Sequence, residues 1–291
     1  MTYNLIHTTI YEYAEPVTVS HHAARVEPRG LPQQQIEQFL LEIGPTPAVQ
    51  QSRVDFFGNQ VCGFSIQEIH QRLEVTARSR VNVVALPPPD PGLSAGWERV
   101  RQLFSDPVSP EVVAPYQFVF DSPLLAASLE LADYARKSFA AHTPLLEAVA
   151  DLNRRIYTDF KYDPTATTVA TPLEAVLAQR AGVCQDFAHL AIACVRSLGL
   201  PARYVSGYLR TRPPEGQKRL VGADASHAWF AVFCPGVGWV DFDPTNNVLP
   251  AEEHISVAFG RDYSDVSPVS GVITGGGKHE VHVSVDVEPL E

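Results

Sequence analysis

Apolar and polar residues alternate one by one in two parts of the chain, at 73–83 and again at 280–288. This period of two is typical of a strand that buries one face. Segment 36–43 fits a strand or a helix, but it ends at Gly44-Pro45 and has strand-like neighbours, which favours a strand. We therefore expect the N-terminal region to be rich in strands.

A turn and a linker organise this region. Residues 56–61 predict a hairpin, because Gly58 and Asn59 tolerate the positive φ that tight turns require. Residues 86–92 contain four prolines, which cannot donate hydrogen bonds to a sheet or continue a helix. We interpret that stretch as a linker and place a β-rich N-terminal domain at 1–90.

The pattern then changes to helices. Apolar residues at three- and four-residue intervals predict helices at 124–139 and 145–157. Thr171 begins a capping-box sequence for a third helix, which Gly182 is expected to end. A fourth helix is predicted at 184–198. The first two helices each follow a cap residue and a proline, Ser122-Pro123 and Thr143-Pro144.

Strands are predicted again at 203–209, 227–233 and 238–243. Because strands follow helices without regular alternation, we expect an α+β fold rather than a parallel α/β sheet. The core domain is placed at 91–250, and 251–291 is expected to be a C-terminal extension whose final strand could join either domain.

Composition bounds the class of protein. The 291 residues are 45% hydrophobic and 19% charged, as in an ordinary globular protein of one or two domains. A formal net charge of −11 argues against a nucleic-acid partner. The first residues lack the basic and apolar regions of a signal peptide, and no apolar run is long enough to span a membrane. We therefore expect a soluble protein with no membrane partner.

The four cysteines are widely spaced and form no CxxC pair, so we expect neither a disulfide framework nor a structural zinc site. Free thiols of this kind suggest the reducing cytoplasm. Cys194 lies among apolar residues in the middle of a predicted helix and is expected to serve packing. Cys62 and Cys234 have no base near them in sequence and are also interpreted as structural.

Cys184 has a different setting. Gly182 is expected to end one helix and Cys184 to open the next, where backbone N–H groups lack intrahelical partners. Such groups can stabilise a thiolate and a developing oxyanion. A buried packing cysteine is the alternative, but polar Gln185 and Asp186 place this turn outside an apolar core.

A base and an orienting carboxylate can be sought on the later strands. The loop at 234–237 joins two predicted strands, and its register brings His227 opposite residues 243–245. Asp243 lies within reach of that imidazole, whereas Asp241 is about two residues away. We therefore choose Cys184, His227 and Asp243 as a nucleophile, a proton shuttle and the residue that orients the shuttle.

Two alternatives remain. His189 is five residues from Cys184 on the same predicted helix, so the two side chains do not face each other, and we expect His189 to be structural. A metal site made of Cys184, His189, His227 and carboxylates matches no common zinc spacing. We expect no metal and no cofactor.

Three ordered motifs resemble the transglutaminase-like core of bacterial and archaeal proteins, and the resemblance covers 157–247. The β-rich start is similar to the N-terminal domain that accompanies this core in many bacterial members. The motifs are Gly182-Val183-Cys184-Gln185-Asp186-Phe187-Ala188, His227-Ala228-Trp229 and Asp243-Pro244-Thr245.

The resemblance implies a papain-like α+β core, in which the helix-start cysteine packs on an antiparallel sheet, and a triad of Cys184, His227 and Asp243. Large animal transglutaminases steady the oxyanion with an upstream tryptophan, but this chain has none between Trp97 and Cys184. Tyr162 is a candidate substitute donor. No calcium-binding loop signature is present either.

The expected function is that of a cysteine-dependent amide hydrolase or peptidase, which acts on a peptide or protein through a thioester. Bacterial members of the family are often regarded as cysteine proteases. The alternatives are transfer of the acyl group to an amine, and a non-catalytic peptide-binding module that retains the fold.

Overall fold

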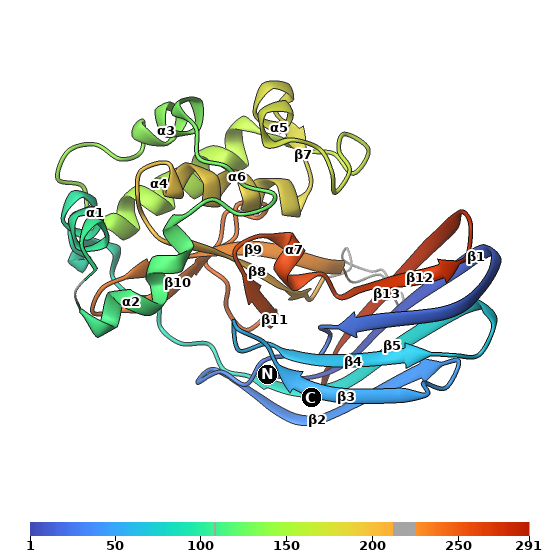
Figure 1. Cartoon of the computed structure of the whole chain (residues 1–291). Coiled ribbons are helices and arrows are strands. Elements are labelled where there is room, and N and C mark those ends of the chain that lie inside the picture. Colours follow the sequence, from blue (N-terminus) through green and yellow to red (C-terminus); the bar gives the residue numbers. More distant parts are fainter. Residues whose placement is uncertain (108, 212–224, 291) are drawn as a thin grey trace, which may run out of the picture.

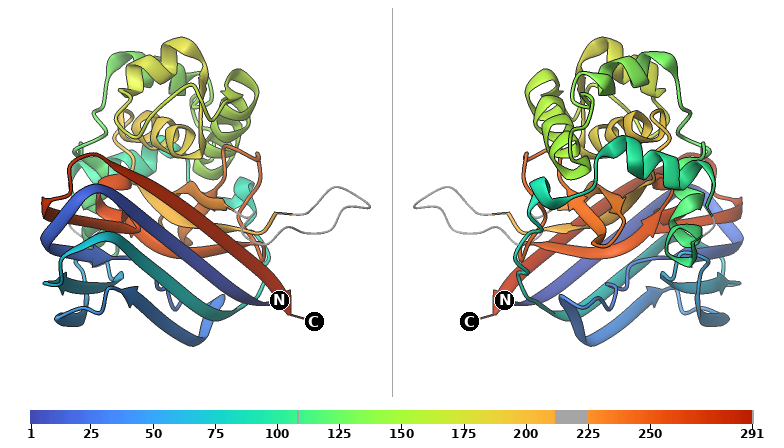
Figure 2. Two further views of the ribbon diagram at one scale, coloured as in Figure 1. Left: turned by 90° about the vertical axis from the view of Figure 1, so that its right-hand side faces the viewer. Right: turned by 90° about the vertical axis from the view of Figure 1, so that its left-hand side faces the viewer.

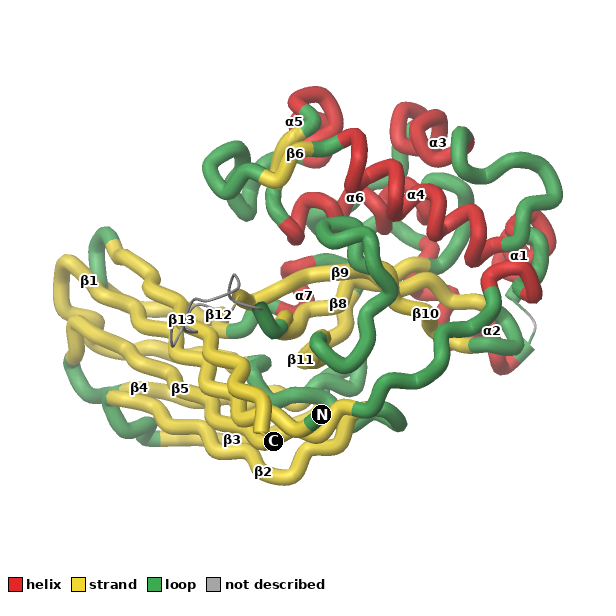
Figure 3. The backbone as a smooth tube through the Cα atoms, turned by 180° about the vertical axis from the view of Figure 1, so that it is seen from behind, coloured by secondary structure: helices red, strands yellow, loops and turns green. Residues whose placement is uncertain are grey.

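The computed structural model describes residues 1–107, 109–211 and 225–290. Two large sheets and a set of helices make up the molecule (Figure 1). In Figure 1 the helices lie above a four-stranded sheet, and a seven-stranded sheet lies below it and to the right. The side views in Figure 2 and the rear view in Figure 3 show the same order. The fold is mixed α+β, as the sequence predicts.

The seven-stranded sheet is built around β1 (Thr2–Ala24), whose first half alternates between buried and half-buried residues. This half pairs antiparallel with β5 (His70–Val83) along one edge and with β13 (His279–Leu290) along the other. The predicted hairpin at 56–61 is confirmed between β3 and β4. The other strands are β2 (Gln34–Gly44), β3 (Val49–Val54), β4 (Gln60–Ile66) and β12 (Val269–Gly275).

The four-stranded sheet is antiparallel throughout, in the order β10-β9-β8-β11. Its first three strands confirm the strands predicted from the sequence. The bounds are β8 (Ala202–Leu209), β9 (Ala225–Cys234), β10 (Gly238–Phe242) and β11 (His254–Gly260).

The central helix α6 (Cys184–Arg196) packs against β9 and β8, and nearly all of its residues are buried. The other helices are α1 (Trp97–Ser105), α2 (Pro110–Tyr116), α3 (Leu129–Arg136), α4 (Leu145–Asp159), α5 (Leu173–Gln179) and α7 (Tyr263–Val266). Short pieces complete the set: η1 (Pro91–Leu93), η2 (Gln117–Val119), β6 (Lys161–Tyr162) and β7 (Ala181–Gly182). None of the described helices has the length and apolar character that crossing a bilayer requires.

The helix predicted at 124–139 begins later than expected. Ser122 and Leu125 exchange backbone hydrogen bonds, which hold the chain in a tight turn rather than a helix. The helix starts after Ser128, whose hydroxyl accepts a hydrogen bond from a backbone N–H of the first turn at 3.2 Å. The helix is therefore capped by Ser128 and not by Ser122, the cap expected from the sequence.

The capping box predicted at Thr171 is also wrong. The Thr171 hydroxyl accepts from the N–H of Thr168 at 2.8 Å, so it closes a loop rather than the start of α5. α5 ends at Gln179, and Arg180 follows it with a left-handed φ of 54°. Gly182, the predicted end of this helix, lies beyond it in β7.

The segment predicted as a C-terminal extension is shared between the two sheets. β11 pairs with β8 in the four-stranded sheet. A boundary at residue 250 would therefore separate β11 from β8, its neighbour in that sheet. β12 and β13 pair with β1 in the seven-stranded sheet. The final strand predicted at 280–288 is confirmed within β13.

Two side-chain amides connect the sheets. Gln34 accepts from the N–H of Ser256 at 2.8 Å and donates to its carbonyl at 2.7 Å. Asn59 makes the same pair of bonds with Phe259, both at 2.8 Å. These amides act as a neighbouring strand would, because they satisfy backbone groups of β11 from the N-terminal domain. We call them the amide clamps.

Candidate active site

Contacts around the first turn of α6 fix the position of Cys184. The Val183 N–H donates to Asp186 Oδ2 at 2.8 Å, and the Thr167 hydroxyl donates to the same oxygen at 2.6 Å. A Cβ at Gly182 would lie 2.6 Å from that oxygen, so a larger residue could not occupy this position without displacing the carboxylate. The helix start is therefore determined by a buried side-chain network.

Cys184 differs from the other three cysteines in exposure. Its side chain is half-buried, whereas Cys62, Cys194 and Cys234 are buried. Cys184 and His227 both line a cavity of about 270 Å³. Among the described residues, the thiol at the helix start is thus the only one that lines this cavity.

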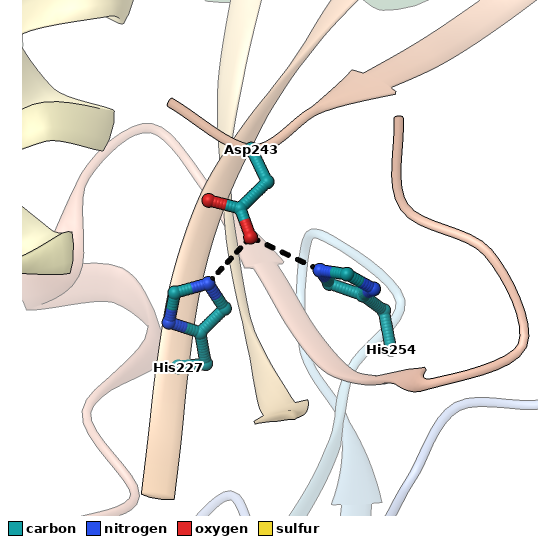
Figure 4. A group of neighbouring side chains, drawn as sticks. All are labelled: His227, Asp243 and His254. Atoms are coloured by element: carbon teal, nitrogen blue, oxygen red, sulfur yellow. Dashed lines mark hydrogen bonds and ion pairs between the residues drawn. The ribbon is translucent and has the colours of Figure 1, made fainter. Parts of the chain in front are cut away.

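His227 lies on β9, and Asp243 directly follows β10, the next strand of the hairpin. His227 Nε2 is 2.8 Å from Asp243 Oδ2 (Figure 4). The second ring nitrogen, Nδ1, does not take part in this bond. Cys184 lines the same cavity as His227, and its side chain is among the groups that raise the pKa of the imidazole. The structure therefore brings Cys184, His227 and Asp243 together in the predicted order.

The protonation of His227 follows from these contacts. Burial lowers the pKa of the imidazole, but hydrogen bonds and charge interactions with Asp243 and Cys184 outweigh it and raise the pKa to about 10. The imidazole is therefore protonated at neutral pH. An imidazolium next to a thiol stabilises the thiolate form of that thiol.

Asp243 is fully buried and accepts five hydrogen bonds. Oδ2 accepts from His227, from His254 Nε2 at 3.0 Å and from the Asn246 amide at 2.7 Å. Oδ1 accepts from the N–H groups of Thr245 and Asn246 at 2.9 and 3.2 Å. Burial raises the pKa of Asp243, but these hydrogen bonds outweigh it and hold the pKa well below its usual range.

His254 is a site residue that the sequence analysis missed. It opens β11, and its ring packs edge-on against Trp229 at a centroid distance of 5.3 Å. Figure 4 shows it on the side of Asp243 opposite His227. The only sequence signal was a histidine at the start of the apolar run 255–259, in a segment where no strand was predicted.

Two rival candidates lie elsewhere. Asp241 accepts from Trp229 Nε1 at 3.2 Å, whereas the carboxylate that bonds to His227 is that of Asp243, as the hairpin register indicates. His189 Nε2 accepts from the N–H of Tyr263 at 3.1 Å, so its lone pair is already in use. Burial lowers the pKa of His189 to about 4, which keeps this ring neutral.

Tyr162 lies close to the cysteine. It pairs with Gly182 in the parallel β6–β7 ladder, and its side chain is 52% exposed. Burial and then the charge of Cys184 raise the pKa of Tyr162, so its hydroxyl stays protonated and able to donate. Its role at an oxyanion remains a prediction.

Three buried side chains of the site have the spacing of metal ligands. His227, Asp243 and His254 place one ligand atom each within 4.8 Å of one another. The Nε2 atoms of His227 and His254 both bond directly to one oxygen of the Asp243 carboxylate. These contacts explain the cluster as a hydrogen-bond network. A second group of possible ligands, all exposed, consists of Glu12, Glu280 and His282.

Two family models match separate regions of the chain. The model of the bacterial transglutaminase-like N-terminal region matches residues 3–82, and that of the transglutaminase-like superfamily matches residues 132–244. A solved structure from Cytophaga hutchinsonii, provisionally described as a cysteine protease, covers 100% of this chain and 92% of its own with a TM-score of 0.73. Its sequence identity is 21%, so it shows a shared fold.

Two sequence relatives are informative. An uncharacterized protein of Mycobacterium tuberculosis is 40% identical over 300 residues, which are 99% of this chain and 93% of that protein. A protein-glutamine gamma-glutamyltransferase of Pseudomonas aeruginosa is 33% identical over 123 residues, but these are 18% of its own length. Full-length similarity and two matched regions in the expected order lead to one conclusion: the chain belongs to the bacterial transglutaminase-like family.

Proposed function

We propose that the protein is a cysteine-dependent amide hydrolase or peptidase in which Cys184 is the nucleophile. The observation that carries the proposal is the buried His227–Asp243 hydrogen bond beside a half-buried thiol at a helix start. In this arrangement His227 exchanges the proton and Asp243 fixes the imidazole orientation.

The reaction proceeds in two steps. The Cys184 thiolate attacks the amide carbonyl carbon, and the C–N bond breaks as the leaving amine takes a proton from His227. Water then gives a proton to His227 and attacks the thioester, which releases a carboxylic acid and restores the thiolate. The Cys184 N–H at the helix start stabilises the developing oxyanion, and Tyr162 is the candidate second donor.

Alkylation with iodoacetamide tests the nucleophile. We expect Cys184 to be modified much faster than the other three cysteines, measured by mass mapping of peptides. Burial raises the pKa of Cys62, Cys194 and Cys234, so these thiols are internal controls. Cys184→Ala should abolish cleavage in a peptide-library digestion. Equal, slow labelling of all four thiols would reject the proposal.

Transfer of the acyl group to an amine is the second candidate, supported by the name of the Pseudomonas aeruginosa relative. Ammonia release from glutamine-containing peptides, with and without an added amine, separates the outcomes. Incorporation of the amine indicates transamidation, whereas new peptide N-termini indicate proteolysis. A non-catalytic peptide-binding module would give neither product.

We also propose the cytoplasm as the compartment of the protein. All four cysteines are free, and one of them is partly exposed. A partly exposed thiol persists most readily in a reducing environment.

A further inference from the structure

The cavity beside Cys184 has walls from both domains. Its volume is about 270 Å³. Cys184 and His227 line it from the core, together with Tyr263. The opposite wall comes from the seven-stranded sheet, from residues of β1 and β13. These strands are separated by almost the entire sequence, yet they reach the same cavity.

The strand register explains this wall. Tyr11 is paired with Val281, and Thr9 with Val283, across the β1–β13 ladder. Because side chains alternate along a strand, these four residues share the face of the sheet that points to the core. We call them the sheet wall. Ser284, the next residue along β13, belongs to the opposite face.

The sheet wall exposes apolar surface at the cavity. Val281 and Val283 are 46% and 56% exposed, although Val285 and Val287 on the same face are fully packed. The exposed valines begin where the core domain stops covering the sheet. Large apolar side chains left accessible next to a nucleophile are suited to contact a bound molecule.

Apart from the Cys184–His227 pair, the described lining of the cavity carries no charged side chain. Among the lining residues that the structure describes there is no Asp, Glu, Lys or Arg. His7 also lines the cavity and lies on β1, two residues before Thr9. Its ring forms hydrogen bonds with the Tyr208 hydroxyl at 2.7 Å and the Thr9 hydroxyl at 3.1 Å. Burial lowers the pKa of His7 to about 4, so this ring is neutral at physiological pH. A charged substrate group that lies against the sheet wall would therefore lose hydration without gaining a partner there.

We infer that the N-terminal sheet is a specificity wall of the active site, and that it selects amide substrates with an uncharged, apolar group next to the scissile bond. This inference rests on the proposed role of Cys184. It assigns the N-terminal domain a direct function in substrate selection, in addition to its contacts with β11.

Alkylating reagents of different shape test the wall without knowledge of the natural substrate. Iodoacetamide and iodoacetanilide carry the same reactive carbon, but the second adds an apolar ring. The measured quantity is the ratio of their rate constants at Cys184, divided by the same ratio for glutathione. We expect wild-type protein to favour iodoacetanilide by about tenfold, because half-burial of a ring has an effect of that order.

Substitutions on neighbouring residues of β13 supply a matched pair. Val283→Asp should lower the rate ratio by about tenfold, since it places a charge on the sheet wall. Ser284→Asp adds the same charge to the opposite face and should leave the ratio unchanged. Val283→Thr, which keeps the side-chain shape, should give a smaller decrease, and thermal unfolding verifies that each variant is folded.

The outcomes separate this inference from the proposed function. Equal ratios in Val283→Asp and Ser284→Asp, with rapid iodoacetamide labelling of Cys184, would overturn the sheet wall and leave the nucleophile intact. Slow labelling of Cys184 by every reagent would instead reject the proposed function.

Discussion

The Asp243 carboxylate has the most demanding environment of any residue in the site. It is fully buried, and two imidazoles donate to one of its oxygens. A buried charge is tolerated only when its hydrogen bonds are satisfied. The geometry of the site therefore depends on groups around the carboxylate as much as on the carboxylate itself.

Replacing this carboxylate should change the pH dependence of the thiol. In wild-type protein His227 remains protonated up to a pKa of about 10. In Asp243→Asn the principal contact that raises this pKa is lost, while burial still lowers it. The pKa of the imidazole then falls, so the ring loses its proton at a lower pH and no longer stabilises a thiolate. We expect iodoacetamide labelling of Cys184 at pH 8 to slow by about tenfold, the effect of one pKa unit.

Asp241→Asn is the control for this experiment. Asp241 is half-buried on the same hairpin, but it accepts a hydrogen bond from Trp229. In Asp241→Asn, the rate of Cys184 labelling plotted against pH should match that of wild-type protein. Identical profiles for the Asp243 and Asp241 variants would contradict the orienting role of Asp243.

His254 should stabilise the protein through Asp243. The pKa of Asp243 is depressed in the folded state, so its contribution is present above the unfolded pKa of about 3.9 and is lost as pH falls below it. His254→Leu removes one of the hydrogen bonds that depress this pKa. We expect acid unfolding to begin at higher pH, with a loss of about 1–3 kcal/mol at pH 7.

His254→Gln retains an N–H donor of similar reach and should recover part of that loss. Circular dichroism against pH, with urea unfolding at pH 7, measures both effects. An acid transition that is unchanged in His254→Leu would show that the bond does not support the carboxylate.

At the scale of elements, the start of α6 depends on a glycine. Gly182→Ala would place a methyl group 2.6 Å from Asp186 Oδ2, which accepts the Val183 N–H. The carboxylate must move, and the helix loses its cap. We expect a loss of about 1–2 kcal/mol and slower labelling of Cys184. Gly30→Ala is a suitable control, because no atom lies within 4 Å of its added Cβ.

The strands that carry the site were predictable where alternation or turn chemistry was clear. The β9–β10 hairpin has a short loop, so the sequence alone determines its register and favours Asp243 over Asp241. β11 gave no such signal, because all of its residues are buried and its sequence does not alternate. His254 was missed for this reason.

Helix starts were harder to predict. Ser122 and Ser128 both have the chemistry of a cap, and only the packed structure distinguishes them. Pairing between distant strands, as in the β1–β13 ladder, was also beyond local patterns. The alternation at 280–288 predicted a strand but not its partner.

At the scale of the whole molecule, the amide clamps connect the N-terminal domain to the strand that carries His254. Asn59→Ala would leave the N–H and the carbonyl of Phe259 without their side-chain partner. Unsatisfied buried groups cost about 1–3 kcal/mol each. We expect lower stability and faster hydrogen exchange at β11, measured by mass spectrometry.

Gln34→Ala should act in the same way at Ser256. Gln35→Ala is the matched control, since Gln35 is the next residue on β2 and is exposed. Exchange at β11 that is equal in all three variants would show that the clamps do not hold this strand.

The β1–β13 ladder sets an order of events during protein synthesis. β1 is synthesised before the core domain, but its partner β13 is made only after it. During translation the core can fold around Cys184 while one side of its cavity is still missing. Under the proposed function, a nascent chain would therefore carry a reactive sulfur without the surface that restricts what reaches it, and selectivity would arrive only once β13 is made.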